Sequence, residues 1–301
     1  MKIIAFLSVV FCCLGDLRST SSNDAELEQI GEANTAVLVA NNALITLRAL
    51  FDSLPKVRNA LALPTPATVV LDAPTIANRL RGSTIAIGYT YFCDDCDAWH
   101  LYLSTGFMIA DGVACTSLHV FQDAEDGPLK NFPIAMDQHG NVYPITGMLA
   151  ADTDADSCLV QISGADSLPP LPLATDARAG EAVYLMSHPD TRYFRFSNGI
   201  ISRLVYERRP DGAKFPLLDV TAEFAPGSSG GPIVNAYGNV LGHVSTIAAT
   251  SLADDGSMDD GSAIVERLCV ASENLVTMAG PGRNPRVFSE SPDDEQQPNS
   301  L

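Results

Sequence analysis

This chain of 301 residues has little positive charge, few histidines and no long apolar run. Lysine and arginine number 18 against 36 aspartates and glutamates, which gives a formal net charge of −18. Nucleic acids and anionic membrane surfaces are bound by basic patches, so this balance argues against both as partners. No apolar run reaches the roughly 18 residues that a membrane-spanning helix needs, so we expect no membrane span.

The first residues have the layout of a secretory signal. Lys2 supplies a positive start, an apolar stretch follows, and Gly15 is a small residue before a cleavage point. Cys12 and Cys13 would suit a lipoprotein, but the residue before them is a phenylalanine, where such a signal has a small side chain. We therefore predict a signal peptide over residues 1–15 and an exported protein, periplasmic or secreted.

Seven cysteines become five once the signal is removed, and one pair of these lies close in sequence. Cys93 and Cys96 lie on a short loop between two runs typical of strands, 84–92 and 99–109. In an oxidising compartment we expect a disulfide across this loop. With His100 nearby, a zinc knuckle is the alternative, but a structural zinc site has four ligands and no second cysteine pair is visible. We therefore predict no metal, and no other cofactor.

A helical pattern follows the signal. Apolar residues recur at heptad a and d spacing, Asn23 can cap the start, and Pro55 ends the run. This pattern predicts one helix over residues 23–54 that packs on the rest of the protein or pairs with copies of itself as a homo-oligomer. Residues 55–80 contain four prolines and look like a linker, so 16–80 form one helix-and-linker region. The predicted apolar stripe comprises Ile30, Ala33, Val37, Ala40, Leu44, Leu47, Phe51 and Leu54.

Residues 81–279 are predicted to form an all-β unit. Short apolar runs recur there, separated by turns that contain Gly, Pro, Asp and Asn. A helix over residues 266–278 closes the unit. Residues 280–301 are polar, acidic and rich in proline, so we expect a disordered tail.

Residues 226–234, Pro-Gly-Ser-Ser-Gly-Gly-Pro-Ile-Val, carry the clearest chemical signal in the chain. Glycine lets the backbone adopt conformations that residues with a Cβ resist. A turn of this kind can point the amides of Gly227 and Ser229 at one spot beside the Ser229 hydroxyl, which makes an oxyanion hole with its nucleophile attached. On its own, however, a turn rich in glycine and serine is more often only a loop.

A nucleophilic serine needs a base, and the base needs an orienting carboxylate. Among five histidines, His119 ends a strand–turn–strand pattern. Asp156 directly precedes an alternating apolar run, so we expect it beneath His119, although Asp152 and Asp154 are close enough to compete. The three aspartates also have the spacing of a calcium loop, but no glycine follows the third, and Ser163 stands where a glutamate would close the loop.

Together these segments resemble the chymotrypsin/trypsin-like serine proteases, and within them the HtrA-like branch. The stretch around Ser229 is similar to the family's Gly-X-Ser-Gly-Gly-Pro nucleophile loop, and Thr-X-X-His-Val at 116–120 is similar to the histidine segment of that branch. Residues 180–203 and 240–247 resemble strands of the family's second barrel. The resemblance covers residues 81–275, and we expect no PDZ module of the kind common in HtrA proteins.

The resemblance implies an all-β fold of two six-stranded antiparallel β-barrels, with His119 and Asp156 in the first and Ser229 in the second. It implies a serine endopeptidase acting on polypeptides. Ser229 attacks the peptide carbonyl, His119 transfers the proton, and Asp156 orients the imidazole. The amides of Gly227 and Ser229 stabilise the oxyanion. Because His119 must be neutral, activity should fall below about pH 6.5, the unperturbed pKa of histidine.

The predicted substrate-binding residues are Glu223, Phe224, Ser245, Thr246 and Ile247. The resemblance places Glu223 where trypsin has its specificity aspartate, so it either favours a basic residue before the scissile bond or simply faces solvent. Ser228 replaces the aspartate that pairs with a newly cut N-terminus in trypsin-like enzymes. The oxyanion hole must therefore be ordered by other groups.

Two other functions are compatible with the same sequence. A catalytically silent relative would bind extended peptides beside the strand Gly242–Ile247 by β-augmentation. A structural protein would assemble through helix 23–54 and use the barrels as a scaffold. The intact triad residues argue against the silent relative.

Overall fold

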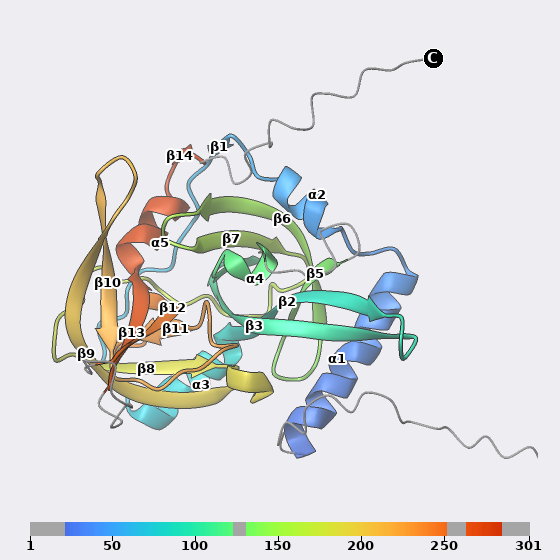
Figure 1. The fold of residues 1–301 in the computed structure, drawn as a ribbon, viewed down its shortest axis with the longest axis horizontal. Coiled ribbons are helices and arrows are strands. Elements are labelled where there is room, and N and C mark those ends of the chain that lie inside the picture. The colour runs from blue at the N-terminus through green and yellow to red at the C-terminus, as the bar shows by residue number, and fades with distance from the viewer. Residues whose placement is uncertain (1–21, 123–130, 252–262, 285–301) are drawn as a thin grey trace, which may run out of the picture.

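The computed structural model describes residues 22–122, 131–251 and 263–284. Their strands form two closed six-stranded antiparallel barrels, accompanied by an N-terminal helix and a short C-terminal helix (Figure 1). The fold class predicted from the sequence is therefore confirmed. The predicted signal peptide at 1–15 and most of the predicted tail lie outside the described residues.

The first barrel has the strand order β2-β3-β4-β7-β6-β5. Its strands are β2 (Thr84–Cys93), β3 (Ala98–Ala110), β4 (Val113–Thr116), β5 (Phe132–Met136), β6 (Val142–Asp152) and β7 (Ser157–Ile162). Alternate side chains of β2, Ile85, Ile87 and Tyr89, are buried in the first-barrel core. This alternation is the period of two that a strand imposes, and β-branched and aromatic residues suit it.

The second barrel has the order β10-β13-β12-β11-β8-β9. Its strands are β8 (Ala182–Ser187), β9 (Arg195–Arg208), β10 (Lys214–Val220), β11 (Pro232–Val234), β12 (Val240–Ser251) and β13 (Ala263–Ala271). Val183 and Leu185 alternate into its core. A third apolar cluster joins the barrels, because Phe107 of β3 packs in the same cluster as Met186 of β8 and Val234 of β11.

Two short helices extend this joining cluster. α3 (Ala73–Ser83) contributes Ile76 and Leu80, and α5 (Ser272–Ala279) contributes Leu275 and Met278. The predicted closing helix began too early, because residues 266–271 belong to β13.

α3 lies within the segment predicted to be a linker, so that prediction was wrong for residues 73–80. The side chain of Asp72 accepts a hydrogen bond from Thr75 N at 2.9 Å, which caps the helix. Pro74 lies in the first turn, where its missing N–H costs nothing. Earlier in the segment, β1 (Val57–Arg58) pairs with β14 (Gly282–Arg283), so the predicted tail is ordered at its start.

The single helix predicted over 23–54 is instead two helices, α1 (Ser22–Ala40) and α2 (Leu47–Asp52). The break follows from local chemistry. Asn42 adopts a left-handed backbone with φ 50°, a conformation that asparagine tolerates better than most residues. Thr46 then caps α2 by accepting a hydrogen bond from Ala49 N at 3.2 Å.

α1 packs on the first barrel, but not through the predicted apolar stripe. Ile30 and Val37 of that stripe are 41% and 58% exposed. The packed face holds Gly31, where a Cβ would collide with the Met136 sulfur. Polar contacts also hold this face, since the Asn34 side chain donates to the Gly140 carbonyl at 2.7 Å. Close backbone approach and hydrogen bonding therefore determine which face of α1 packs on the first barrel.

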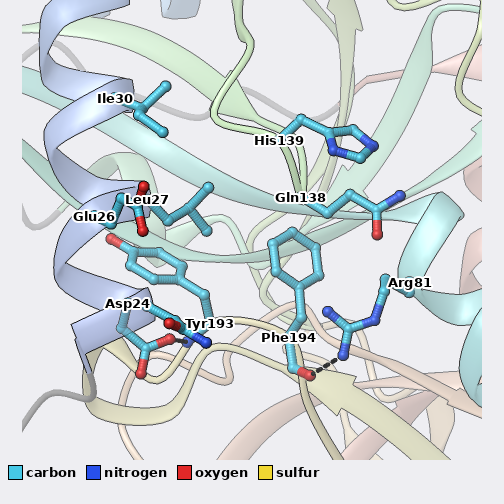
Figure 2. A pocket seen from close by; sticks show the side chains of 10 residues that line it. Asp24, Glu26, Leu27, Ile30, Arg81, Gln138, His139, Tyr193 and Phe194 are labelled. Carbon is cyan, nitrogen blue, oxygen red and sulfur yellow. Dashed lines mark hydrogen bonds between the residues drawn. The ribbon is translucent and has the colours of Figure 1, made fainter.

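The N-terminal end of α1 lies over a cavity of about 530 Å³, with Arg81 on its opposite side (Figure 2). Asp24 accepts a hydrogen bond from Tyr193 N at 3.1 Å, and Arg81 donates to the Phe194 carbonyl at 3.4 Å. These contacts tie α1 and α3 to the segment that precedes β9. No helix in the described part of the chain is both long enough and apolar enough to cross a bilayer.

Candidate active site

Strand pairing in the first barrel brings His119 to Asp156. β4 ends at Thr116, and a short helix, α4 (His119–Gln122), begins three residues later. Asp156 immediately precedes β7, and β4 pairs with β7 in the register Thr116↔Cys158. The two residues thus leave adjacent strands at the same edge of the barrel.

Asp156 holds both the backbone and the ring of His119. One carboxylate oxygen accepts from His119 N at 2.9 Å, and the other lies 2.6 Å from His119 Nδ1. A carboxylate only accepts hydrogen bonds, so Nδ1 carries the proton. Nε2 is then the unprotonated ring nitrogen, as the predicted role of His119 as a base requires.

The competing aspartates are engaged elsewhere. Arg209 lies 2.7 Å from Asp152 and 3.3 Å from Asp154. Burial is the largest single influence and acts to raise the pKa of Asp152, but the hydrogen bonds from Arg209 and from backbone amides, together with the Arg209 charge, outweigh it, and the pKa is lowered. Asp156 is therefore the member of this group that meets His119.

The nucleophile loop lies against the first barrel. Gly230 has φ +83°, and a Cβ there would collide with the Thr105 carbonyl and the Thr116 hydroxyl. Only glycine suits this position, because it tolerates positive φ and lacks the colliding atom. Since Thr116 ends the strand before His119, this contact places Ser229 beside the histidine segment.

Two first-barrel residues hold the carbonyl groups of the nucleophile loop toward the first barrel. Ser104 Oγ donates to the Ser229 carbonyl at 2.9 Å, and Thr105 Oγ1 donates to the Gly227 carbonyl at 2.8 Å. Gly227 has φ +90°. Within the described ranges, neither the Gly227 nor the Ser229 N–H has an acceptor. Both amides therefore remain available for an oxyanion.

Sequence reasoning missed Ser104 and Thr105. Because Ser228 replaces the aspartate that orders this loop in trypsin-like enzymes, other groups must hold the loop, and Ser104 and Thr105 do so. The Ser228 hydroxyl accepts a 3.4 Å hydrogen bond from Ala225 N. The loop is ordered from the opposite barrel rather than by an aspartate. Nothing local marks this pairing in the sequence, because more than 120 residues separate the donors from their acceptors.

His119, Gly227 and Ser229 line one cavity of about 670 Å³. Its other walls come from the β2–β3 hairpin, from α1 through Glu28, and from the loop that contains Asp190. The structure thus brings the predicted base, the predicted nucleophile and the predicted oxyanion donors to a single opening, with Asp156 bonded behind the base.

The predicted substrate-binding residues are not among the described residues that line this cavity. Glu223 is exposed and lies 3.2 Å from Arg195, which favours the solvent-facing alternative for its role. Phe224 is buried, Ser245 is half-buried, and Thr246 is exposed. The side chain of Ile247 lies outside those that the structure describes. Their roles in substrate binding remain predictions.

Residues 104–242 match the family model of the trypsin-like peptidase domain. The chain contains a trypsin-like peptidase domain. The match includes the segments of both barrels that carry His119, Asp156 and Ser229.

The peptidase domain is similar to curated serine proteases of the HtrA and DegP groups. The mitochondrial serine protease HTRA2 of Bos taurus is 32% identical over 155 residues, which are 49% of this chain and 32% of the relative. A probable periplasmic DegP-like serine endoprotease of Halomonas elongata is 29% identical over 152 residues, which are 50% of this chain and 30% of the relative. The chain thus spans about a third of the length of these relatives.

Solved structures agree on the fold. Rv3671c from Mycobacterium tuberculosis H37Rv, in an inactive form, superposes with a TM-score of 0.52 at 16% identity. The likeness covers 72% of this chain and 95% of that one. At this identity it shows the fold alone.

The peptidase domain also contains a hydrogen-bonded Ser–His pair outside this cavity. Ser157 Oγ lies 2.7 Å from His243 Nε2, and His243 Nδ1 donates to the Val244 carbonyl at 3.1 Å. Burial lowers the pKa of His243, which keeps the ring neutral. Both side chains are fully buried, so a polypeptide cannot reach them, and we assign the pair a packing role behind Asp156.

Because His188 is buried, we expect the stability of the fold to decrease in acid. The ring is buried, its Nδ1 accepts from Phe194 N at 2.9 Å, and burial lowers its pKa from 6.5 to about 3. The unfolded chain then takes up a proton below about pH 6.5, whereas the folded chain does so only near pH 3. Stability should therefore fall as the pH drops through this window, by about 2 kcal/mol between pH 7 and pH 5.

Urea unfolding at several pH values measures this loss. In His188→Asn the amide oxygen can replace Nδ1 as the acceptor, and this variant should lose about 2 kcal/mol less than the wild type over the same range. Equal pH dependence in the two proteins would contradict the prediction.

Proposed function

We propose that this chain is an exported serine endopeptidase that hydrolyses peptide bonds through Ser229, His119 and Asp156. One observation carries the proposal. His119, hydrogen-bonded to Asp156 at 2.6 Å on the first barrel, and Ser229, in a glycine-rich loop of the second, line the same cavity. The family match to the trypsin-like peptidase domain supports the same reaction class.

In the proposed reaction, Ser229 Oγ attacks the carbonyl carbon of a peptide bond while His119 Nε2 takes its proton. The tetrahedral intermediate expels the amine, which receives that proton from His119, and an acyl-enzyme remains. Water then attacks the ester with His119 again as the base, and the Ser229 hydroxyl is restored. Asp156 stabilises the imidazolium in both steps.

The free amides of Gly227 and Ser229 are proposed to bind the oxyanion. A donor of this kind contributes about 3 kcal/mol to transition-state stabilisation. Their benefit depends on being oriented before the substrate arrives. The hydrogen bonds from Ser104 and Thr105 to the loop carbonyls supply this orientation.

A fluorophosphonate probe tests the proposal directly, because it reacts with an activated serine hydroxyl and not with an ordinary one. Peptide mapping of the labelled protein should place the adduct on Ser229. A folded protein that resists the probe but binds extended peptides would overturn the proposal and favour the silent binding module.

Export and domain division belong to the same proposal. Residues 1–15 have the layout of a signal, and one similar protein is named as periplasmic and another as mitochondrial. We propose that residues 16–80 form the N-terminal helical region and 81–279 the peptidase unit. N-terminal sequencing of protein recovered from outside the cytoplasm tests the cleavage.

We also propose that α1 joins two copies of the chain. Its exposed apolar residues Ala33, Val37 and Ala40 are accessible to a partner, because α1 packs on the barrel through another face, at Gly31 and Asn34. Val37→Glu should shift the mass measured by sedimentation toward the monomer, since it places charge in the apolar contact. Val57→Glu, at an exposed valine in β1, is the matched control. A monomeric wild type would contradict the assembly.

A further inference from the structure

Two thiols and an imidazole converge at the tip of the β2–β3 hairpin. In the structure Cys93 and Cys96 are both thiols and do not form the predicted disulfide. Their sulfur atoms and a ring nitrogen of His100 all lie within 4.8 Å of one another. In the described ranges of the chain, no other three metal-ligating side chains meet in this way.

The hairpin turn explains the convergence. β2 ends at Cys93, which pairs with Ala98 at the start of β3. Asp97 adopts a left-handed backbone with φ 55°, and its N–H donates to the Cys93 carbonyl at 2.9 Å. This closed turn returns Cys96 toward the strands, where His100 Nε2 lies 2.9 Å from its sulfur.

A carboxylate from α1 orients the imidazole. Glu32 Oε1 lies 2.8 Å from His100 Nδ1, so Nδ1–H donates to the carboxylate and the Nε2 lone pair faces Cys96. Metal-bound histidines in proteins almost always donate their second ring N–H to a carboxylate, carbonyl or water. The ring is therefore held in the tautomer and direction that a metal ion requires.

We propose that Cys93, Cys96 and His100 bind one Zn²⁺ through two thiolates and Nε2, with the fourth position open to solvent. Tetrahedral zinc places its sulfur and nitrogen ligands roughly 3.5–3.8 Å apart. The contact between Cys96 and His100 then lengthens by roughly half an ångström, and the other donor atoms lie no more than 4.8 Å apart, so a small movement of the side chains completes the geometry. Each thiol releases its proton to solvent when it binds.

The donor set selects the class of metal. Thiolate and imidazole ligands favour zinc over calcium or magnesium, which prefer oxygen. Three aspartates in the turn, Asp94, Asp95 and Asp97, add negative charge beside the donors and attract a cation. The three ligands lie within eight residues of one hairpin, so little further ordering is needed.

The position of the site links it to the cavity. His100 lines the same cavity as His119 and Ser229, and Glu32 belongs to α1. A metal at the hairpin tip therefore holds α1, the hairpin and one cavity wall together. This consequence does not depend on the proposed peptidase activity.

The test uses the full chain, stripped of metal by a chelator and reduced with a phosphine that keeps the thiols free. Titration with Zn²⁺ against a chromophoric chelator should give one ion per chain and a concentration-dependent rise in Tm. Co²⁺ should give the thiolate-to-metal charge-transfer band and the intense visible bands of a tetrahedral site. No uptake by the reduced, folded protein, or a cobalt spectrum without thiolate bands, would overturn the proposal.

Matched variants separate the ligands from general cation binding. Cys93→Ser with Cys96→Ser, and separately His100→Ala, should lose the stoichiometric ion, whereas Cys115→Ser at a buried thiol should retain it. Retention by the double variant would overturn the site. Glu32→Gln should weaken zinc binding about 10–100-fold. Glu26→Gln on the same helix should not, and an unchanged affinity in Glu32→Gln would overturn the orienting role.

Discussion

Replacing Ser229 by alanine is expected to abolish fluorophosphonate labelling and to lower peptide hydrolysis by about 10⁴–10⁶-fold. The change removes the attacking oxygen, while the loop itself remains held by its carbonyls. Labelling followed by mass spectrometry, and turnover of a quenched fluorescent peptide library, measure the two effects. The free energy of unfolding, measured with urea, should be nearly unchanged, because the variant loses only a half-buried hydroxyl.

Ser157→Ala is the informative control for this experiment. Ser157 contacts a histidine at 2.7 Å, so contact with a histidine alone does not identify the nucleophile. They differ in access, because Ser157 is fully buried and Ser229 lines the cavity. Ser157→Ala should still be labelled at Ser229 and should lose about 1–3 kcal/mol of stability, since the Ser157 hydroxyl hydrogen-bonds a buried ring. Labelling lost in Ser157→Ala and kept in Ser229→Ala would reverse the assignment.

Asp156→Asn is expected to lower kcat by about 10⁴-fold without unfolding the protein. The asparagine oxygen can still accept from His119 N, which preserves the segment. Its NH₂ group, however, faces His119 Nδ1 and favours the tautomer with the proton on Nε2. That tautomer cannot accept the proton of Ser229, so the base is disabled while the geometry is retained.

Asp154→Asn provides the comparison for this variant. Asp154 lies two residues earlier and contacts Arg209 at 3.3 Å instead of the histidine. Its activity should stay within about twofold of the wild type, because a partly exposed ion pair is worth little. Similar losses in both variants would mean that the Asp156 effect is electrostatic at long range rather than tautomeric.

The helical regions show where sequence patterns misled. Heptad spacing over 23–54 predicted one helix whose apolar stripe packs on the rest of the protein or pairs with copies of itself, yet the chain forms two helices, and Ile30 and Val37 of the stripe are 41% and 58% exposed. Gly31 lets α1 approach Met136 closely, and Asn34 reaches the Gly140 carbonyl. A stripe of apolar residues reports what a helix can bury, whereas the facing surface decides what it does bury.

α3 was missed for a different reason. Prolines made residues 55–80 look like a linker, although Pro74 stands in the first turn of a helix, where proline is well tolerated. The Asp72 cap was present in the sequence and could have revealed the helix.

The sequence by itself predicted the class of fold and the proposed reacting groups. Alternating apolar runs predicted an all-β unit, the resemblance to the protease family implied two barrels, and the segments around His119, Asp156 and Ser229 supplied the candidates, because strand periodicity and glycine-rich turns are local properties. Only the tertiary structure showed which residues orient these groups. Ser104 and Thr105 order the oxyanion loop, and Glu32 aims His100 at two thiols, through contacts across 68 to 125 residues. Such pairings depend on how barrels and helices pack, and local patterns do not encode them.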